Sequence, residues 1–99
     1  MITWIRSATI APGKTGEAFA FVRSATKLIK DKHNIMIAVG RPIAGNPNRV
    51  FWRSEHADMA EYEADHRKIS TDGEFLQIMR EAGPCFVAET THDEILQSV

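Results

Sequence analysis

The sequence predicts an α+β domain, and three observations support this class. Alternating side chains indicate strands near Thr3–Ile10, Asn34–Ile43, Arg49–Glu55 and Cys85–Thr91. Apolar residues at helical spacing indicate helices near Thr15–Lys32 and Ala57–Ala82. The length of 99 residues suits one domain, residues 1–99. The resulting order, β-α-β-β-α-β, is that of the ferredoxin-like fold, an antiparallel four-stranded sheet with two helices on one face.

The first helix has the clearest pattern in the chain. It follows Ala11-Pro12-Gly13-Lys14, a composition typical of a tight turn. We expect Thr15 to be the N-cap, because a side-chain hydroxyl can accept a hydrogen bond from a free backbone N–H. The apolar residues recur three and four apart, at Ala18, Phe19, Phe21, Val22, Ala25, Leu28 and Ile29. This stripe predicts the face that packs on the sheet.

The second and third strands predict a sheet with apolar residues on both faces. In the second strand the two alternating sets are Ile35, Ile37 and Val39, and Met36, Ala38 and Gly40. In the third they are Val50, Trp52 and Ser54, and Arg49, Phe51, Arg53 and Glu55. The residues between, Ala44-Gly45-Asn46-Pro47-Asn48, predict an exposed loop.

The second helical stretch is interrupted. Ser54 or Asp58 is expected to cap its start. A stripe expected to be buried then follows at Met59, Tyr62, His66 and Ile69. Thr71-Asp72-Gly73 breaks the pattern, and Asp72 can cap a restart that runs to the stop signal Gly83-Pro84.

The C-terminal part predicts one more strand and a tail. The strand is expected at Cys85–Thr91, and the tail from His92 to Val99 is expected to be a short helix or an arm. Ile95, Leu96 and Val99 make that tail apolar enough to dock, including on a partner. Because several strands are apolar on both faces, the face away from the helices needs a cover. A second subunit is the simplest one.

Composition restricts the possible partners. The net charge of −1 argues against nucleic acid, because phosphate binding needs a clustered basic surface. A single cysteine, Cys85, rules out an internal disulfide and predicts a small buried hydrophobe. No signal-peptide pattern, membrane-length apolar run, phosphate loop or metal-ligand spacing is found. We therefore expect a cytoplasmic protein without membrane contact, metal or cofactor.

Short motifs resemble the dimeric α/β-barrel superfamily, which includes NIPSNAP proteins and antibiotic-biosynthesis monooxygenases. They are Ile10-Ala11-Pro12-Gly13-Lys14 before a Phe-rich helix, Val50-Phe51-Trp52-Arg53-Ser54 before an acidic one, and the break at Ser70–Phe75. The similarity is greatest to NIPSNAP proteins. It implies a homodimer with a small-molecule cavity in or beside the barrel. It does not imply one chemistry, because the superfamily mixes enzymes and binders.

The haem-degrading branch of that superfamily is not matched. Resemblance to that branch would imply a set of three residues, with Asn on the first strand and Trp and His on the second helix. Here the first strand has no Asn, and no Trp occurs between Ala57 and Ala82.

His66 and Tyr62 are the candidate catalytic residues. They lie four apart, so their side chains touch on a helix. An imidazole beside a phenol could bind a substrate hydroxyl or relay a proton. The alternative is that His66 is hydrogen-bonded and structural.

Five further residues are candidate ligand contacts. Arg6, Arg53 and Glu89 are expected on one sheet face, where Glu89 or an anionic ligand would pair with a guanidinium. The alternatives are an ion pair that fixes a dimer and ordinary exposure near the strand ends. Trp4 and Trp52 would stack on a flat substrate, or they belong to the core.

The sequence is compatible with three functions. The first is a NIPSNAP-like protein that binds a small, largely apolar or aromatic ligand. The second is a cofactor-free monooxygenase or isomerase acting on a phenolic or polycyclic substrate. The third is a non-catalytic dimerisation module.

Overall fold

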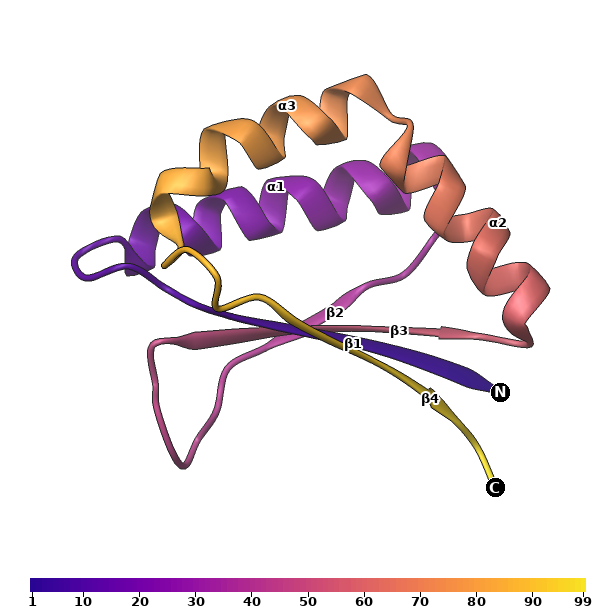
Figure 1. Ribbon diagram of the computed structural model, residues 1–99. Helices are drawn as coiled ribbons and strands as arrows, with labels where there is room; N and C mark the ends of the chain where they lie inside the picture. Colours follow the sequence, from indigo (N-terminus) through magenta and orange to yellow (C-terminus); the bar gives the residue numbers. More distant parts are fainter.

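The computed structural model describes residues 1–99 and shows one sheet with all helices on one side (Figure 1). Its elements are β1 (Ile2–Thr9), α1 (Thr15–His33), β2 (Ala38–Gly40), β3 (Arg49–His56), α2 (Met59–Ser70), α3 (Gly73–Ala82), the 3₁₀ turn η1 (Gly83–Cys85) and β4 (His92–Gln97). The predicted α+β class and the ferredoxin-like order are confirmed.

The sheet has the order β2-β3-β1-β4, and every neighbouring pair is antiparallel. The first strand therefore lies between the third and the fourth. Trp4 lies opposite Ser54 on β3 and opposite Ile95 on β4, which fixes the register of the three long strands. Since side chains alternate along each strand, this register decides which residues share a face.

One face of the sheet is covered by helices and the other is not. The covered face carries Val50 and Ser54 of β3, both buried, whereas Arg53 and Glu55 on the other face are exposed. The predicted division of β3 into two sets is confirmed. By register, the even-numbered residues of β1, including Trp4 and Arg6, lie on the covered face.

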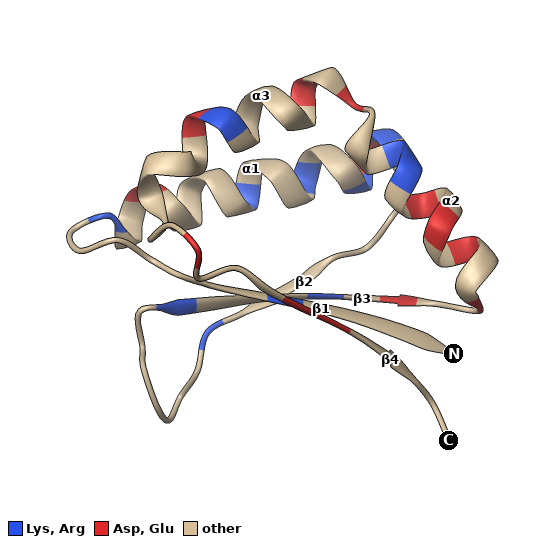
Figure 2. Ribbon diagram, viewed as in Figure 1, with Lys and Arg blue, Asp and Glu red and all other residues tan.

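Helix α1 packs on the sheet through the predicted stripe, of which Ala18, Val22, Ala25 and Ile29 are buried. The expectation that Thr15 is the N-cap was wrong: Lys14 occupies that position, without a side-chain hydrogen bond, and Thr15 is the first helical residue. Asn34 ends the helix in the left-handed conformation. Its exposed residues include the basic Arg23, Lys27, Lys30 and Lys32, and Figure 2 shows basic residues along this helix in blue. No helix of the chain is both long and apolar enough to span a membrane.

The second helical stretch is two helices, as the break at residues 71–73 predicts. Asp58 caps α2 by accepting a hydrogen bond from the Glu61 backbone N–H, and Asp72 caps α3 through Glu74 and Phe75. Helix α3 runs beside α1, whereas α2 descends towards the end of β3 (Figure 1). This bend leaves α2 away from the sheet along much of its length.

Two strands differ from the prediction. The second strand was expected at Asn34–Ile43 but pairs only over Ala38–Gly40. It begins later because Asn34 belongs to the helix cap, and it ends earlier because the chain separates from β3 before Pro42. The connection from residue 41 to 48 contains no helix or strand, which confirms the predicted loop.

The last strand was placed too early in the chain. Residues 85–91 do not form a strand: Cys85 belongs to η1, and Phe86 makes only an isolated bridge with Ile10. Strand β4 is instead His92–Gln97, so the tail is neither a helix nor an arm. Its residues are all exposed at the sheet edge, so the strand has no apolar alternation by which it could be recognised.

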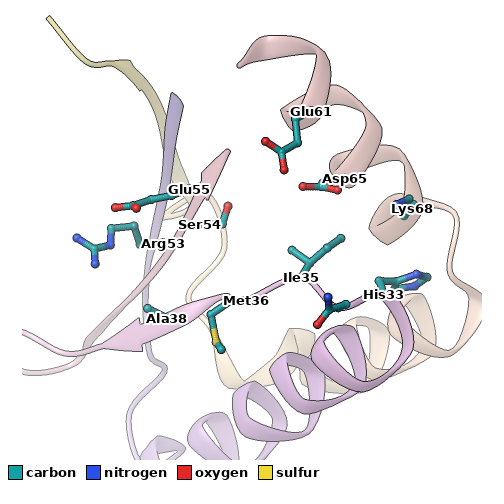
Figure 3. Close-up of a pocket in the computed structure, with 11 residues that line it drawn as sticks. His33, Ile35, Met36, Ala38, Arg53, Ser54, Glu55, Glu61, Asp65 and Lys68 are labelled. Carbon is teal, nitrogen blue, oxygen red and sulfur yellow. The ribbon is translucent and has the colours of Figure 1, made fainter. Parts of the chain in front are cut away.

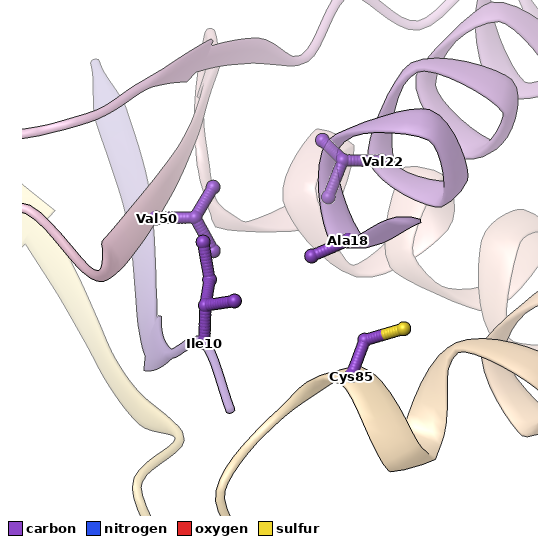
Figure 4. Packing of buried hydrophobic residues seen from close by; sticks show 5 residues of the cluster. All are labelled: Ile10, Ala18, Val22, Val50 and Cys85. Carbon is purple, nitrogen blue, oxygen red and sulfur yellow. The ribbon is translucent and has the colours of Figure 1, made fainter. Parts of the chain in front are cut away.

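A cluster of buried hydrophobic residues lies between α1, η1 and the sheet. It comprises Ile10, Ala18, Val22, Val50 and Cys85 (Figure 4). Cys85 is 2% exposed, as its interpretation as a small buried hydrophobe predicted. We call these five residues the packed cluster.

Candidate functional site

A cavity of about 540 Å³ lies between the covered face of the sheet and the helices. We call it the sheet–helix cavity. Of its 26 lining residues, 17 are hydrophobic, so the space suits an apolar molecule with a few polar groups. Its aromatic wall consists of Trp4, Phe21, Trp52, Tyr62, Phe75 and Phe86.

Six of the seven residues selected from the sequence line this cavity. They are Trp4, Arg6, Trp52, Tyr62, His66 and Glu89. Arg53, the seventh residue, does not line the cavity. It lies directly opposite Ile5 in the β1–β3 register and therefore on the uncovered face, so the expectation that Arg6 and Arg53 share a face was wrong.

Arg6 pairs with a different carboxylate from the one expected. Its Nε and Nη2 atoms donate to the two carboxylate oxygens of Asp93, at 2.7 and 2.8 Å. Glu89 lies instead in the turn before β4, exposed and with a positive φ of 65°. The hydrogen bond from Arg6 lowers the pKa of Asp93 against the opposing effect of burial. Asp93 was missed because only the pairing of β4 with β1 brings it to Arg6.

Tyr62 lies between two imidazoles. Its ring meets that of His56 edge-on, with centroids 5.3 Å apart, and stacks on that of His66 at 5.7 Å. The contact between Tyr62 and His66 is the one that their spacing predicted. Burial raises the pKa of Tyr62, and the negative charge of Asp93 adds to the rise. The phenol therefore stays protonated at neutral pH and can donate a hydrogen bond into the cavity.

Helix α2 is less buried than its stripe predicted. None of its residues is buried, Met59 is 44% exposed, and His66 is exposed as well. The reason is the bend at Asp72, which turns α2 away from the sheet and leaves the cavity beneath it. His66 is thus neither a core residue nor remote from the cavity: it lies on the cavity wall with access to solvent.

A hydrogen-bonded chain of three side chains was not recognised in the sequence. His56 Nε2 lies 2.8 Å from the Ser54 hydroxyl, and His56 Nδ1 lies 2.8 Å from Asp65 Oδ2. Ser54 and His56 are 6% and 5% exposed. Their spacing of two on a strand indicates a shared face, but Asp65 comes from α2, and only the folded chain brings it to His56.

The two tryptophans belong to the cavity rather than to a filled core. Both are only partly buried. The Trp52 ring lies 5.9 Å from that of Phe86 at an angle of 55°, and the Arg6 guanidinium lies 5.3 Å from the Trp4 ring centroid. A flat ligand would therefore meet aromatic side chains from β1 and β3.

A second, shallower pocket of about 440 Å³ borders Ser54 and Asp65 from the other side (Figure 3). It lies between the end of α1, α2 and the edge of β3, and only 3 of its 11 lining residues are hydrophobic. Arg53 and Glu55 line it. No group of three or more His, Cys, Asp or Glu side chains is arranged to hold a metal ion here or elsewhere in the chain.

The structure is similar to solved NIPSNAP and monooxygenase structures. An uncharacterized NIPSNAP domain protein from Burkholderia xenovorans superposes with a TM-score of 0.82 at 16% identity, over 100% of this chain and 95% of that one. A NIPSNAP family protein from Agrobacterium tumefaciens gives 0.81 at 18% identity, over 99% of this chain and 85% of that one. The chain has the NIPSNAP fold.

A candidate antibiotic biosynthesis monooxygenase from Bordetella bronchiseptica shares this fold, with a TM-score of 0.72 and 24% identity over 99% of this chain and 96% of that one. The predicted resemblance is therefore confirmed at the level of the fold, over the full length of the chain. No protein-family model and no curated protein sequence matches the chain.

Proposed function

We propose that this NIPSNAP-fold chain binds a small, largely apolar or aromatic molecule in the sheet–helix cavity. The observation that carries the proposal is the cavity itself, about 540 Å³ in volume and lined mainly by hydrophobic residues. Ligand pockets of drug-sized molecules have this size and composition. A folded domain of this length would otherwise fill such a space with side chains, since protein interiors are close-packed.

The polar groups of the cavity indicate what else the ligand carries. Tyr62 offers a hydroxyl donor, His66 an imidazole, and Arg6 one guanidinium nitrogen, Nη1, which Asp93 does not use. These groups suit a hydroxyl or carbonyl oxygen on an aromatic ring. Phenols and aromatic ketones are therefore the class of ligand that the cavity fits.

Trp52 and Phe51 provide a matched test of this proposal. They are neighbours on β3, but Trp52 lines the cavity and Phe51 lies on the uncovered face. With 2-naphthol as the probe, we expect Trp52→Leu to weaken binding by about tenfold, the equivalent of roughly 1.4 kcal/mol. Phe51→Leu should leave the affinity unchanged. Isothermal titration calorimetry measures both, and equal affinities in the two variants and the wild type would contradict cavity binding.

A homodimer is the second part of the proposal, and the uncovered face supports it. This face carries Ile5, Phe51 and Leu96, the last 46% exposed. Arg53, Ile5 and Glu94 lie in one row across β3, β1 and β4. A two-fold axis along β1 would thus place the basic side of this face over the acidic side of the other copy.

Native mass spectrometry tests the dimer. We expect twice the mass of the chain for the wild type and the mass of the monomer for Phe51→Asp, because a charged carboxylate would have to be buried in the interface in place of an aromatic ring. Binding of 2-naphthol to Phe51→Asp separates the two parts of the proposal. A wild-type monomer would refute the dimer alone.

Catalysis without a cofactor is a second candidate function, favoured by the position of Tyr62 between His56 and His66. A substrate phenol in the cavity would meet a phenol donor and an imidazole within one site. In that case Tyr62→Phe and His66→Ala would abolish turnover of the substrate while the melting temperature changes little. Loss of stability without any effect on turnover would assign both residues a structural role.

A further inference from the structure

We propose that Ser54, His56 and Asp65 form a nucleophile–base–carboxylate chain that accepts the acyl group of a small aryl ester bound in the sheet–helix cavity. This inference rests on the proposed function and specifies its ligand class. The atoms that meet are Ser54 Oγ with His56 Nε2 and His56 Nδ1 with Asp65 Oδ2, each pair 2.8 Å apart. With the proton on Nδ1, the imidazole donates to Asp65 and accepts from Ser54. This is the connectivity that activates a serine hydroxyl.

Burial holds the three groups in place. Ser54 and His56 are nearly inaccessible, and the Asp65 side chain is 17% exposed. Tyr62 packs edge-on against His56 and restricts its ring. Each imidazole nitrogen of His56 has a hydrogen-bond partner, Ser54 at Nε2 and Asp65 at Nδ1. A fixed orientation between nucleophile and base is what such chemistry requires.

Although it is nearly buried, the serine borders the cavity, where the acyl group would have to approach it. Ser54 and His56 both line its wall, and Ser54 also borders the shallow pocket (Figure 3). Trp4 lies directly opposite Ser54 on the covered face, and Arg6 lies one row further along. An aryl group would therefore stack near Trp4 while its carbonyl lies near Ser54. Asp93 leaves Nη1 of Arg6 free, and this cationic nitrogen is our candidate donor to the oxygen that becomes negative.

The reaction balances without a cofactor. Ser54 Oγ bonds to the ester carbonyl carbon as its proton passes to His56 Nε2. The bond from that carbon to the aryl oxygen breaks, and the aryl group leaves as a phenol with the proton from His56. Water then attacks the acyl carbon and gives a proton to His56. The serine is released with that proton, and the acyl group leaves as a carboxylic acid.

A fluorophosphonate probe tests the nucleophile directly, because it forms a covalent bond with activated serines. We expect one adduct per chain in the intact mass, mapped to Ser54 by peptide sequencing. Ser54→Ala should lose the adduct. Ser7→Ala is the matched control: Ser7 is a buried serine of β1 on the uncovered face, and its hydroxyl accepts a hydrogen bond from Arg49 rather than facing an imidazole.

The roles of His56 as base and of Asp65 as carboxylate are tested through the rate at which the probe labels Ser54. His56→Gln should slow labelling by more than about 100-fold, the usual contribution of a general base. Asp65→Asn should slow it as well, and Asp65→Glu should restore part of the rate, which a purely structural role would not predict. Circular dichroism of each variant establishes that it is folded. Because the adduct is mapped in the wild type, the test does not depend on any variant being stable.

The outcomes separate this inference from the proposed function. If 2-naphthol binds and Ser54 is not labelled, the acyl-transfer inference is wrong and the binding function stands. If Ser54 is labelled and 2-naphthol does not bind, the nucleophile is established and the aromatic ligand class is refuted. An adduct on another serine, or one that persists in Ser54→Ala, overturns the inference.

Discussion

The two ends of the layer between sheet and helices are built differently. At one end the packed cluster closes around Ile10, Val50 and Cys85, all at most 2% exposed. At the other end, none of the residues of α2 is buried, and a cavity lies between this helix and the sheet. The sheet itself accounts for the difference. Its covered face carries Val50 at the packed end, whereas Arg6, Ser54 and His56 of the same face line the cavity.

This gradient shows how a small domain can combine stability with a cavity. Apolar side chains at one end supply the burial that holds the fold together. Polar side chains at the other end satisfy one another in pairs and chains, such as Arg6 with Asp93, and so tolerate incomplete packing. Substitutions at the two ends should therefore differ in which property they change.

The largest effect is expected in the packed cluster. Ile10→Ala should lower the free energy of unfolding by about 2–5 kcal/mol, because Ile10 is surrounded and the space it leaves cannot collapse fully. Urea denaturation measures the change. Binding of 2-naphthol to the folded fraction should persist, since Ile10 does not line the cavity. A loss below about 1 kcal/mol would show that this end is not well packed.

Trp4→Ala should cost less stability although it removes a larger side chain. Trp4 already faces the cavity and is only partly buried, so we expect a loss of about 1–2 kcal/mol. Its effect on the affinity for 2-naphthol should be the greater one. The same denaturation and calorimetry experiments, run beside Ile10→Ala, compare the two ends directly. A greater loss of stability for Trp4→Ala would reverse the comparison.

A smaller effect is expected for the ion pair beneath α2. The side chains of Arg6 and Asp93 are 36% and 41% exposed, so solvent screens their attraction. A double-mutant cycle of Arg6→Met and Asp93→Asn should give a coupling of about 1 kcal/mol or less. High salt should reduce it further. A coupling of several kcal/mol would mean that a second subunit or a ligand buries the pair.

The effect that depends on pH concerns Asp72 at the bend between α2 and α3. His33 and Lys32, together with the Phe75 backbone N–H, lower the pKa of Asp72 from 3.8 to about 2, with the contact to His33 the largest cause. The charged form therefore stabilises the fold above pH 3.8, and this stabilisation is lost as the pH falls to about 2.

Asp72→Asn tests this charge without removing the cap, because asparagine also caps helices. We expect a lower melting temperature than the wild type at pH 7 and a difference that shrinks between pH 4 and pH 2, in line with the lowered pKa. Asp31→Asn, on the exposed side of α1, is the control. A difference that stays constant with pH would assign the effect to packing rather than to charge.

By itself, the sequence determined the class of fold, the element order and the packing face of α1, because these follow from local periodicity and from caps such as Asp58 and Asp72. It also selected Trp4, Arg6, Trp52, Tyr62 and His66, which meet in one cavity, since strand alternation and the spacing of Tyr62 and His66 are local properties. Glu89 lines the cavity as well, but from a turn that the sequence pattern assigned to a strand.

Only the tertiary structure decided the rest. The position of β4 depends on its pairing with β1, which no apolar pattern marks in an exposed edge strand. The partner of Arg6 and the chain from Ser54 to Asp65 join residues of different elements. Such contacts depend on register and on the angle at which α2 leaves the sheet. Both are set by packing between elements that lie apart in the sequence.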